Sequence, residues 1–233
     1  MSDTNNSRYL PIISGLFIAS LLVTSVTNTK LIMVGPFIMT GGTLLFPVAF
    51  IFNDILTEVY GFARTRVVIW TGVFCQLFAG TFYWVVGQLP AASFWIHQEA
   101  YEAVLNTAPR LAIASVIAYL CGEFANSTVL SRMKYRSHGA RDFRQSLRFI
   151  LSTIVGEGVD SIVFIAVAFG GLMPIGELVY TAGSIYTLKV IYEALVTPLT
   201  TRFANWLKEK EGVDKIDDPF TTNYNPFIFG DGA

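Results

Sequence analysis

Long uninterrupted apolar blocks are the feature that most constrains this chain. Of its 233 residues, 53% are hydrophobic and only 14% are charged, whereas a typical soluble domain carries roughly 25% charged residues. Blocks of about 18 or more apolar residues mark helices that cross a lipid bilayer. A soluble domain of this length needs a charged shell around its core, and this chain has too few charges to form one. We therefore expect an all-α integral membrane protein.

The apolar blocks predict six transmembrane helices, at residues 9–28, 43–60, 67–89, 109–129, 149–169 and 178–203. Pro47 predicts a kink in the second helix. The two cysteines, Cys75 and Cys121, lie inside apolar blocks and are expected to be small buried hydrophobic residues. Residues 31–42 read LIMVGPFIMTGG, and the Gly-Pro pair favours a turn. We prefer a short extracellular hairpin or re-entrant cap there over an extension of the second helix.

Lysine and arginine are distributed unevenly along the chain. In the six-span arrangement, thirteen of the sixteen basic residues fall on one side of the membrane. The connections on the other side hold only Lys30 and Arg110, together with the acidic Glu99, Glu102 and Glu177. Because basic loops stay in the cytoplasm, we expect both termini to be cytoplasmic in a multi-pass protein of the cell inner membrane.

The connection between the fourth and fifth spans is the most basic part of the chain, with Arg132, Lys134, Arg136, Arg141, Arg144 and Arg148. We interpret it as a topology signal beside anionic lipid rather than as a nucleic-acid site. Residues from about 206 to 233 are polar and acidic, which predicts a short cytoplasmic tail. The chain is therefore expected to be a single transmembrane transport domain over residues 1–233.

Seven ionisable residues nevertheless lie inside the apolar blocks: Asp54, Glu58, Glu123, Glu157, Asp160, Lys189 and Glu193. Each costs on the order of 2.5 to 3.5 kcal/mol at the centre of a bilayer. They must therefore face the interior of the bundle or a wet cavity. Three pairs are spaced three or four residues apart, which places each pair on one helix face. We expect four helices to present polar stripes around one shared substrate cavity.

The predicted substrate-binding residues are Asn53, Asp54, Glu58, Glu123, Asn126, Glu157, Asp160, Lys189 and Glu193. A purely structural role stays open for some of them. Asp54 and Glu58 can cap or pair near the cytoplasmic interface, and Lys189 can pair with Glu193 one turn along its own helix. Residues 122–127 and 156–161 share the pattern G-E-x-x-[N/D]-S, which places both segments at the cavity.

Motifs of catalysis are missing from the sequence. There is no H-E-x-x-H, no G-x-S-x-G and no Walker A motif, and the only histidines, His97 and His138, lie in predicted loops. We therefore expect no catalytic residues, no metal site and no cofactor. An intramembrane enzyme remains a minor alternative.

One pattern is specific enough to indicate a family. It comprises Phe46-Pro47, the run Asn53-Asp54-Ile-Leu-Thr57-Glu58-Val-Tyr-Gly61, residues 110–119, the stretch from Gly156 to Asp160-Ser161, Lys189 and Asn225-Pro226-Phe227. This pattern resembles the queuosine precursor transporter family, also called the vitamin uptake transporter family. The resemblance covers residues 9–227, and the run in the second helix is its most specific part.

The resemblance implies an importer of the queuosine precursors 7-cyano-7-deazaguanine and 7-aminomethyl-7-deazaguanine. It also implies a fold similar to the substrate-binding subunits of energy-coupling-factor transporters. The alternative within transport is a vitamin-binding subunit energised by a separate ATPase. The expected partners are the 7-deazaguanine and the lipid bilayer, with a homodimer as an option and no nucleic acid. Six acids against one lysine in the spans make proton coupling a further hypothesis, with Glu157 or Asp160 as the carrier.

Overall fold

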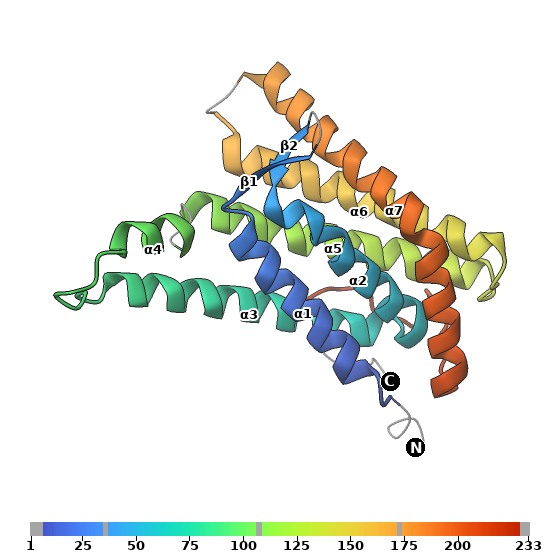
Figure 1. The fold of residues 1–233 in the computed structure, drawn as a ribbon. Helices are drawn as coiled ribbons and strands as arrows, with labels where there is room; N and C mark the ends of the chain where they lie inside the picture. The colour runs from blue at the N-terminus through green and yellow to red at the C-terminus, as the bar shows by residue number, and fades with distance from the viewer. Residues whose placement is uncertain (1–6, 35–36, 106–108, 172–173, 229–233) are drawn as a thin grey trace.

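The computed structural model describes residues 7–34, 37–105, 109–171 and 174–228. Its elements, in chain order, are α1 (Leu10–Thr27), β1 (Leu31–Val34), β2 (Phe37–Thr40), the 3₁₀ turn η1 (Gly41–Leu44), α2 (Phe46–Tyr60), α3 (Phe62–Gln88), α4 (Gln98–Leu105), α5 (Pro109–Arg136), α6 (Phe143–Phe169) and α7 (Ile175–Glu211). The long helices pack side by side into one bundle (Figure 1). The predicted all-α class is confirmed, apart from one short hairpin.

Among the described residues, four segments are long and apolar enough to cross a membrane: Leu10–Thr27, Phe62–Gln88, Ile113–Arg136 and Phe143–Ala168. The helices α2 and α7 are not among them. The 15 residues of α2 span only roughly 22 Å, which is less than the roughly 30 Å of a hydrocarbon core. The apolar part of α7 is interrupted by Lys189 and Glu193. The structure therefore shows four candidate spans, and six spans remain a prediction.

The short helix α2 lies in the middle of the bundle. It packs against α1, α3, α5 and α7, and all of its residues from Asn53 to Tyr60 are buried. A helix that is buried on every side belongs to the core of an assembly rather than to its lipid-facing surface. This position explains why α2 can carry charged residues, because its neighbours supply their partners.

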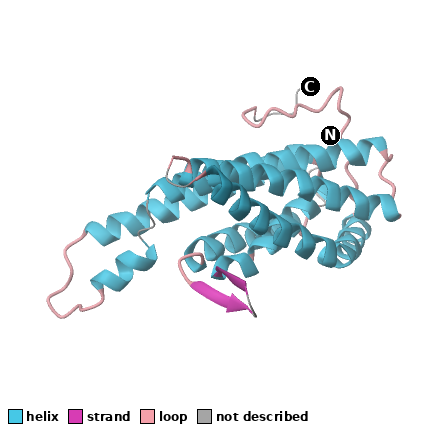
Figure 2. Ribbon diagram, turned by 90° about the horizontal axis from the view of Figure 1, so that it is seen from above, coloured by secondary structure: helices cyan, strands magenta, loops and turns pink. Residues whose placement is uncertain are grey.

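Residues 31–40 form the predicted hairpin. β1 and β2 are antiparallel, with Leu31 opposite Thr40 and Val34 opposite Phe37, and the two turn residues between the strands lie outside the described residues. The alternative, a longer second helix, is therefore wrong. In Figure 2 the hairpin and the C-terminal loop lie on opposite sides of the bundle.

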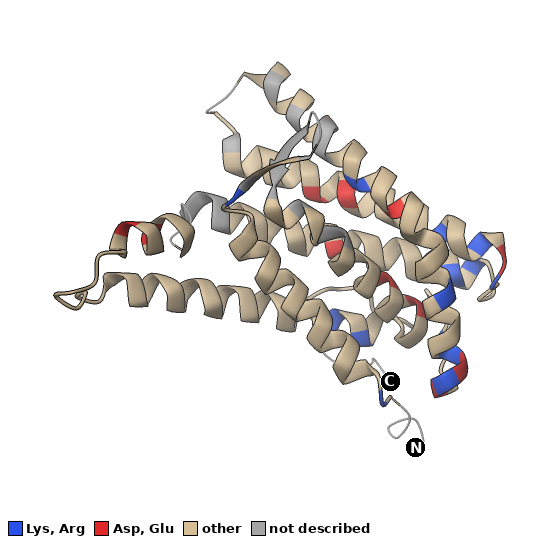
Figure 3. Ribbon diagram, in the orientation of Figure 1, with Lys and Arg blue, Asp and Glu red and all other residues tan. Residues whose placement is uncertain are grey.

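The helices extend further into the basic segments than the apolar blocks predict. α3 begins at Phe62 rather than at residue 67, α5 ends at Arg136, α6 begins at Phe143 and α7 ends at Glu211. Most of the Lys and Arg residues that were assigned to connections are therefore on helix ends. Figure 3 shows them gathered at the end of the bundle that holds both termini. This end is called the basic end below.

Two local expectations are wrong. Pro47 does not kink the second helix, because α2 begins at Phe46 and Pro47 lies in its first turn. A proline there sacrifices no helical hydrogen bond. Cys121 is exposed and Cys75 is only half-buried, and both are free thiols. They face outward because each lies on the outer surface of a membrane-length helix, where lipid replaces the protein core.

The C-terminal segment after α7 folds back across the basic end. The Lys215 N–H donates to the Val59 carbonyl at 3.0 Å, and the Phe62 N–H donates to Asp217 at 2.8 Å. The indole N–H of Trp70 donates to the Pro226 carbonyl at 2.7 Å. Gly61, between α2 and α3, has a positive φ of 83°, and an added Cβ would lie 2.7 Å from the Lys215 side chain. Glycine thus permits both the sharp turn and the close approach of the tail.

Candidate functional site

A layer of polar side chains, all buried except the partly buried Lys189, crosses the middle of the bundle. Its members are Asn53 and Asp54 on α2, Glu123, Asn126 and Ser127 on α5, Glu157 and Asp160 on α6, and Lys189 and Glu193 on α7. We call this set the central polar layer. It contains eight of the nine residues that the sequence predicted for the substrate site, with Glu58 as the exception.

Lys189 joins α7 to α6 inside the central polar layer. Its ammonium lies 2.8 Å from a Glu157 oxygen and 2.9 Å from an Asp160 oxygen. Glu157 and Asp160 are three residues apart, so both carboxylates project from one face of α6 toward the same cation. Lys189 thus pairs across to α6, whereas the alternative raised for it was a pair with Glu193 along its own helix.

Neutral amide and hydroxyl groups connect α2 to α5. The Asn126 amide donates to Asp54 at 2.6 Å. One helical position away, the Asn53 amide donates to the Ser127 hydroxyl at 3.0 Å, and that hydroxyl lies 3.2 Å from the Asn53 carbonyl oxygen. These contacts fix the orientation of Asp54. Its second oxygen is buried and has no hydrogen-bond partner among the described residues.

Glu123 and Glu193 are buried carboxyl groups whose oxygens all lack a hydrogen-bond partner among the described residues. Glu123 is 0% exposed and Glu193 is 2% exposed. Glu123 lies within electrostatic reach of Asp54, Glu157, Asp160 and Lys189. Leaving a buried polar group without a partner costs about 1 to 3 kcal/mol, and more for a charged group. Such groups are the natural attachment points for a ligand that supplies hydrogen-bond donors.

The repeated G-E-x-x-[N/D]-S segments meet where α5 crosses α6. A Cβ on Gly122 would lie 2.8 Å from the Asp160 Cβ, and a Cβ on Gly156 would lie 2.7 Å from the Asn126 Cβ. Each glycine of one repeat thus packs against the fifth residue of the other, which is Asp160 or Asn126. The two antiparallel helices present equivalent carboxylates, Glu123 and Glu157, at a crossing that only glycine permits. Lys189 pairs with Glu157 on α6, whereas the oxygens of Glu123 on α5 have no hydrogen-bond partner among the described residues.

Glu58 lies in a second cluster, at the basic end. Arg148 donates to both of its oxygens, with a distance of 2.9 Å for the Nε bond. Lys208 lies 2.6 Å from one oxygen, and Lys134 donates to the Glu58 backbone carbonyl. The structural alternative raised for Glu58 therefore fits its contacts. The geometry separates it from the other predicted site residues.

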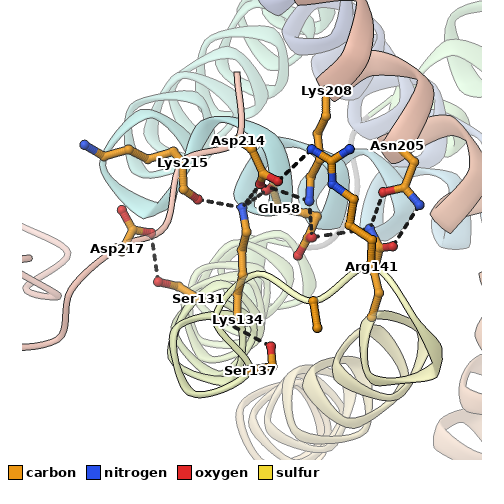
Figure 4. A network of polar contacts seen from close by, with 12 residues as sticks. Glu58, Ser131, Lys134, Ser137, Arg141, Asn205, Lys208, Asp214, Lys215 and Asp217 are labelled. Carbon is orange, nitrogen blue, oxygen red and sulfur yellow. Dashed lines mark hydrogen bonds and ion pairs between the residues drawn. The ribbon is translucent and has the colours of Figure 1, made fainter. Parts of the chain in front are cut away.

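We call this second cluster the basic-end network, and it consists of Glu58, Lys134, Gln145, Arg148, Asn205, Lys208 and Asp214. Figure 4 labels Glu58, Lys134, Asn205, Lys208 and Asp214 of this network. Lys134, Arg148 and Lys208 were interpreted as exposed topology signals, but they are 1%, 0% and 2% exposed. The sequence spacing of some network residues indicates that they share a helix face. Gln145 and Arg148 on α6, and Asn205 and Lys208 on α7, form matching amide–cation pairs three residues apart.

Asp214, in the tail, completes the network. It lies 2.5 Å from Lys134, 3.0 Å from Lys208 and 3.0 Å from Arg141. Partial burial opposes the ionisation of Asp214, but the hydrogen bond and charge of Lys134 and the charge of Lys208 outweigh it and hold its pKa below the ordinary value. The tail thus supplies a permanent negative charge to a cluster of buried cations.

Several membrane-length helices with a charged layer buried between them define a multi-pass membrane protein of the small-molecule transporter class. Residues 40–203 match the family model described as "Putative vitamin uptake transporter". The chain is also 32% identical, over 162 residues, to the "Probable queuosine precursor transporter" of Bacillus subtilis (strain 168). The aligned segment covers 68% of this chain and 69% of that protein.

The chain therefore belongs to the vitamin uptake transporter family, as the sequence pattern predicted, and it is not an enzyme. No solved structure matches it, so the likeness to energy-coupling-factor subunits stays a prediction. The alternative of an ATPase-energised vitamin-binding subunit is not favoured by the name of the Bacillus subtilis relative.

Proposed function

We propose that this protein imports the queuosine precursors 7-cyano-7-deazaguanine and 7-aminomethyl-7-deazaguanine across the inner membrane. The observation that carries the proposal is the set of buried carboxyl oxygens in the central polar layer that have no partner among the described residues, above all those of Glu123. The named function of the Bacillus subtilis relative supports the same substrate class.

The chemistry of the substrate suits this layer. A 7-deazaguanine is flat and presents a ring N–H beside an exocyclic amino group, so one carboxylate can accept two parallel hydrogen bonds from it. Such bonds to a charged acceptor are about twice as strong as bonds between neutral groups. We assign this contact to Glu123. The second oxygen of Asp54 and both oxygens of Glu193, which are buried and also lack hydrogen-bond partners among the described residues, complete the acceptor surface.

The proposed topology has six spans, with α2 and α7 crossing the membrane beside the four apolar helices. The helix α2 is short but is enclosed by α1, α3, α5 and α7. A charged helix is tolerated at membrane depth when protein rather than lipid surrounds it. The Tyr9 N–H donates to Glu211 at 2.6 Å, which places the start of α1 beside the end of α7. An even number of crossings accounts for this arrangement, and the basic end is then cytoplasmic.

Uptake by living cells tests the function directly. Cells that lack both their own synthesis and their own uptake of 7-deazaguanines should acquire queuosine in tRNA from external precursor only when they carry this gene. The control is the same strain with Glu123→Gln, which keeps the size of the side chain. If cells with the native gene accumulate neither labelled precursor nor queuosine, the substrate assignment is wrong.

A further inference from the structure

The basic-end network lies between the central polar layer and the aqueous space at the basic end. On α6, Thr153 is buried and lies between Arg148 of the network and Glu157 of the layer. At 1.5 Å per helical residue, Arg148 and Glu157 are separated by roughly 13 Å along the helix. Any solute that leaves the layer toward the basic end must pass the level of Arg148.

The network ties together four helices at this level. Glu58 comes from α2, Lys134 from α5, Arg148 from α6 and Lys208 from α7, and ion pairs or hydrogen bonds join each of them to Glu58. A reciprocal pair of amide hydrogen bonds, at 3.0 and 2.9 Å, joins Gln145 of α6 to Asn205 of α7. Charged and polar bonds thus join four helices at this level, beside the buried apolar side chains of Leu130, Phe149 and Leu207.

The C-terminal segment covers the outer side of the same network. Besides Asp214, the backbone carbonyl of Lys215 accepts a hydrogen bond from Lys134 at 2.6 Å, and Asp217 accepts one from Ser131 at 2.8 Å. Among the described residues, the ion pairs of the three cations Lys134, Arg148 and Lys208 are with two acids, Glu58 and Asp214. Removing either acid or one shared cation therefore upsets the balance of charge.

We propose that the basic-end network is the cytoplasmic gate of the carrier and that the C-terminal segment is its latch. This inference rests on the proposed function for its direction of transport. Glu58 then serves the gate and not the substrate, and the conformation described here is closed toward the cytoplasm. Hydrogen-bonded charge pairs suit a gate because they are strong when made and are replaced by water when they separate.

Accessibility of a reporter cysteine tests the gate. The parent protein carries Cys75→Ala, Cys121→Ala and Thr153→Cys, and an impermeant maleimide is applied to inside-out and to right-side-out vesicles. Lys208→Met and Asp214→Asn each remove charge-assisted hydrogen bonds, so labelling in inside-out vesicles should rise about tenfold or more. Labelling in right-side-out vesicles should stay unchanged.

The matched control is Asp142→Asn. Asp142 forms an exposed ion pair with Arg144 at the same end of the bundle but outside the network, and asparagine still caps α6. This variant should label like the parent. Unchanged labelling in both network variants, or an equal rise on both faces, would overturn the gate. If Lys208→Met does not fold, Asp214→Asn decides alone, because its partly exposed carboxylate lies in the tail rather than in a helix.

A reversible cross-link provides a readout that a merely structural role would not move. With cysteines at Gln145 and Asn205, a short bifunctional thiosulfonate should stop uptake, and a reducing agent should restore it. Uptake that persists through complete cross-linking contradicts the gate. If the uncross-linked parent transports no 7-deazaguanine, the proposed function fails instead, while the labelling experiment still reports on the gate.

Discussion

Glu123 is a buried carboxyl group whose oxygens have no partner among the described residues, and this makes its substitution informative in two directions. Glu123→Gln should weaken binding of a 7-deazaguanine about 10- to 150-fold, because the loss of a charged acceptor costs roughly 1.5 to 3 kcal/mol. The ligand-free protein should not lose stability, since no native bond is broken. Binding by equilibrium dialysis and thermal unfolding in detergent measure the two effects. If Glu123→Gln, Glu157→Gln and Asp160→Asn all bind like the native protein, the substrate site lies elsewhere.

For Glu58 we expect the opposite outcome, a loss of stability rather than a loss of substrate binding. Arg148 and Lys208 pair with its carboxylate, and Lys134 donates to its backbone carbonyl. Glu58→Gln therefore leaves Arg148 without a carboxylate partner among the described residues and leaves Lys208 with Asp214 alone. Removal of one partner from a buried ion pair destabilises a protein by about 3 to 5 kcal/mol. We expect a clear fall in the thermal unfolding temperature and no specific loss of substrate contacts in the protein that still folds. A variant as stable as the native protein would show that the network is solvated rather than buried.

At the scale of helices, the crossing of α5 and α6 depends on Gly122. Its added Cβ would lie 2.8 Å from the Asp160 Cβ and 3.1 Å from the Gly156 carbonyl oxygen. Gly122→Ala should therefore push the helices apart and cost about 1 to 3 kcal/mol of stability. Gly80→Ala on α3 is the control, because an added Cβ there meets no atom within 4 Å. The control should match or slightly exceed the native stability. Equal unfolding temperatures for Gly122→Ala and the native protein would contradict this.

The elements that could be predicted are those encoded locally. The α1 helix matches its apolar block to within one residue at each end. The strands β1 and β2 lie on either side of the Gly-Pro pair, as the sequence predicted. The helix ends were predicted too short because an apolar block stops at its first charged residue. The helices α5 and α7 continue through charged residues to Arg136 and Glu211, and Gly212 ends α7 in the left-handed conformation. The short helix α4 has no apolar block and was not predicted.

The central polar layer was predictable for a different reason. Charges within apolar blocks are so costly that their inward orientation is required by the bilayer itself. Their separation into two clusters was not predictable. The partners of Glu58 are 90 and 150 residues away along the chain, at Arg148 and Lys208. Because those residues lie in polar segments, their local sign is limited to the spacing that pairs Arg148 with Gln145 and Lys208 with Asn205, and that spacing does not identify Glu58 as their partner.

For the molecule as a whole, the decisive prediction is its orientation in the membrane. Both termini and the connection between α5 and α6 should be cytoplasmic, since thirteen of the sixteen basic residues then lie inside. The bond between the start of α1 and the end of α7 fits this arrangement. A cysteine replacing His138, in a background without Cys75 and Cys121, should react with an impermeant reagent only in inside-out vesicles. Reaction from the outside of intact cells would reverse the topology.

The energy source of transport follows from the charge of the central polar layer. Asp54, Glu123, Glu157, Asp160 and Glu193 face one cation, Lys189. Desolvation and mutual repulsion oppose the ionisation of all five acids together. When Glu157 or Asp160 is protonated, Lys189 faces one remaining carboxylate, and the ammonium and that carboxylate together carry no net charge. Binding and release of this proton can therefore accompany the movement of substrate. We propose proton coupling through one of these two acids.

Purified protein in liposomes distinguishes this coupling from facilitated diffusion followed by metabolic trapping. An inward proton gradient should drive labelled 7-deazaguanine transiently above its equilibrium level, because each substrate molecule then enters with a proton moving down its gradient. Glu157→Gln or Asp160→Asn should abolish this overshoot and preserve the exchange of internal for external substrate, since exchange needs binding but no net proton transfer. Glu123→Gln, in contrast, should impair exchange and overshoot together. Uptake that only ever reaches equilibrium in the native protein, whatever the pH difference, would leave diffusion as the mechanism.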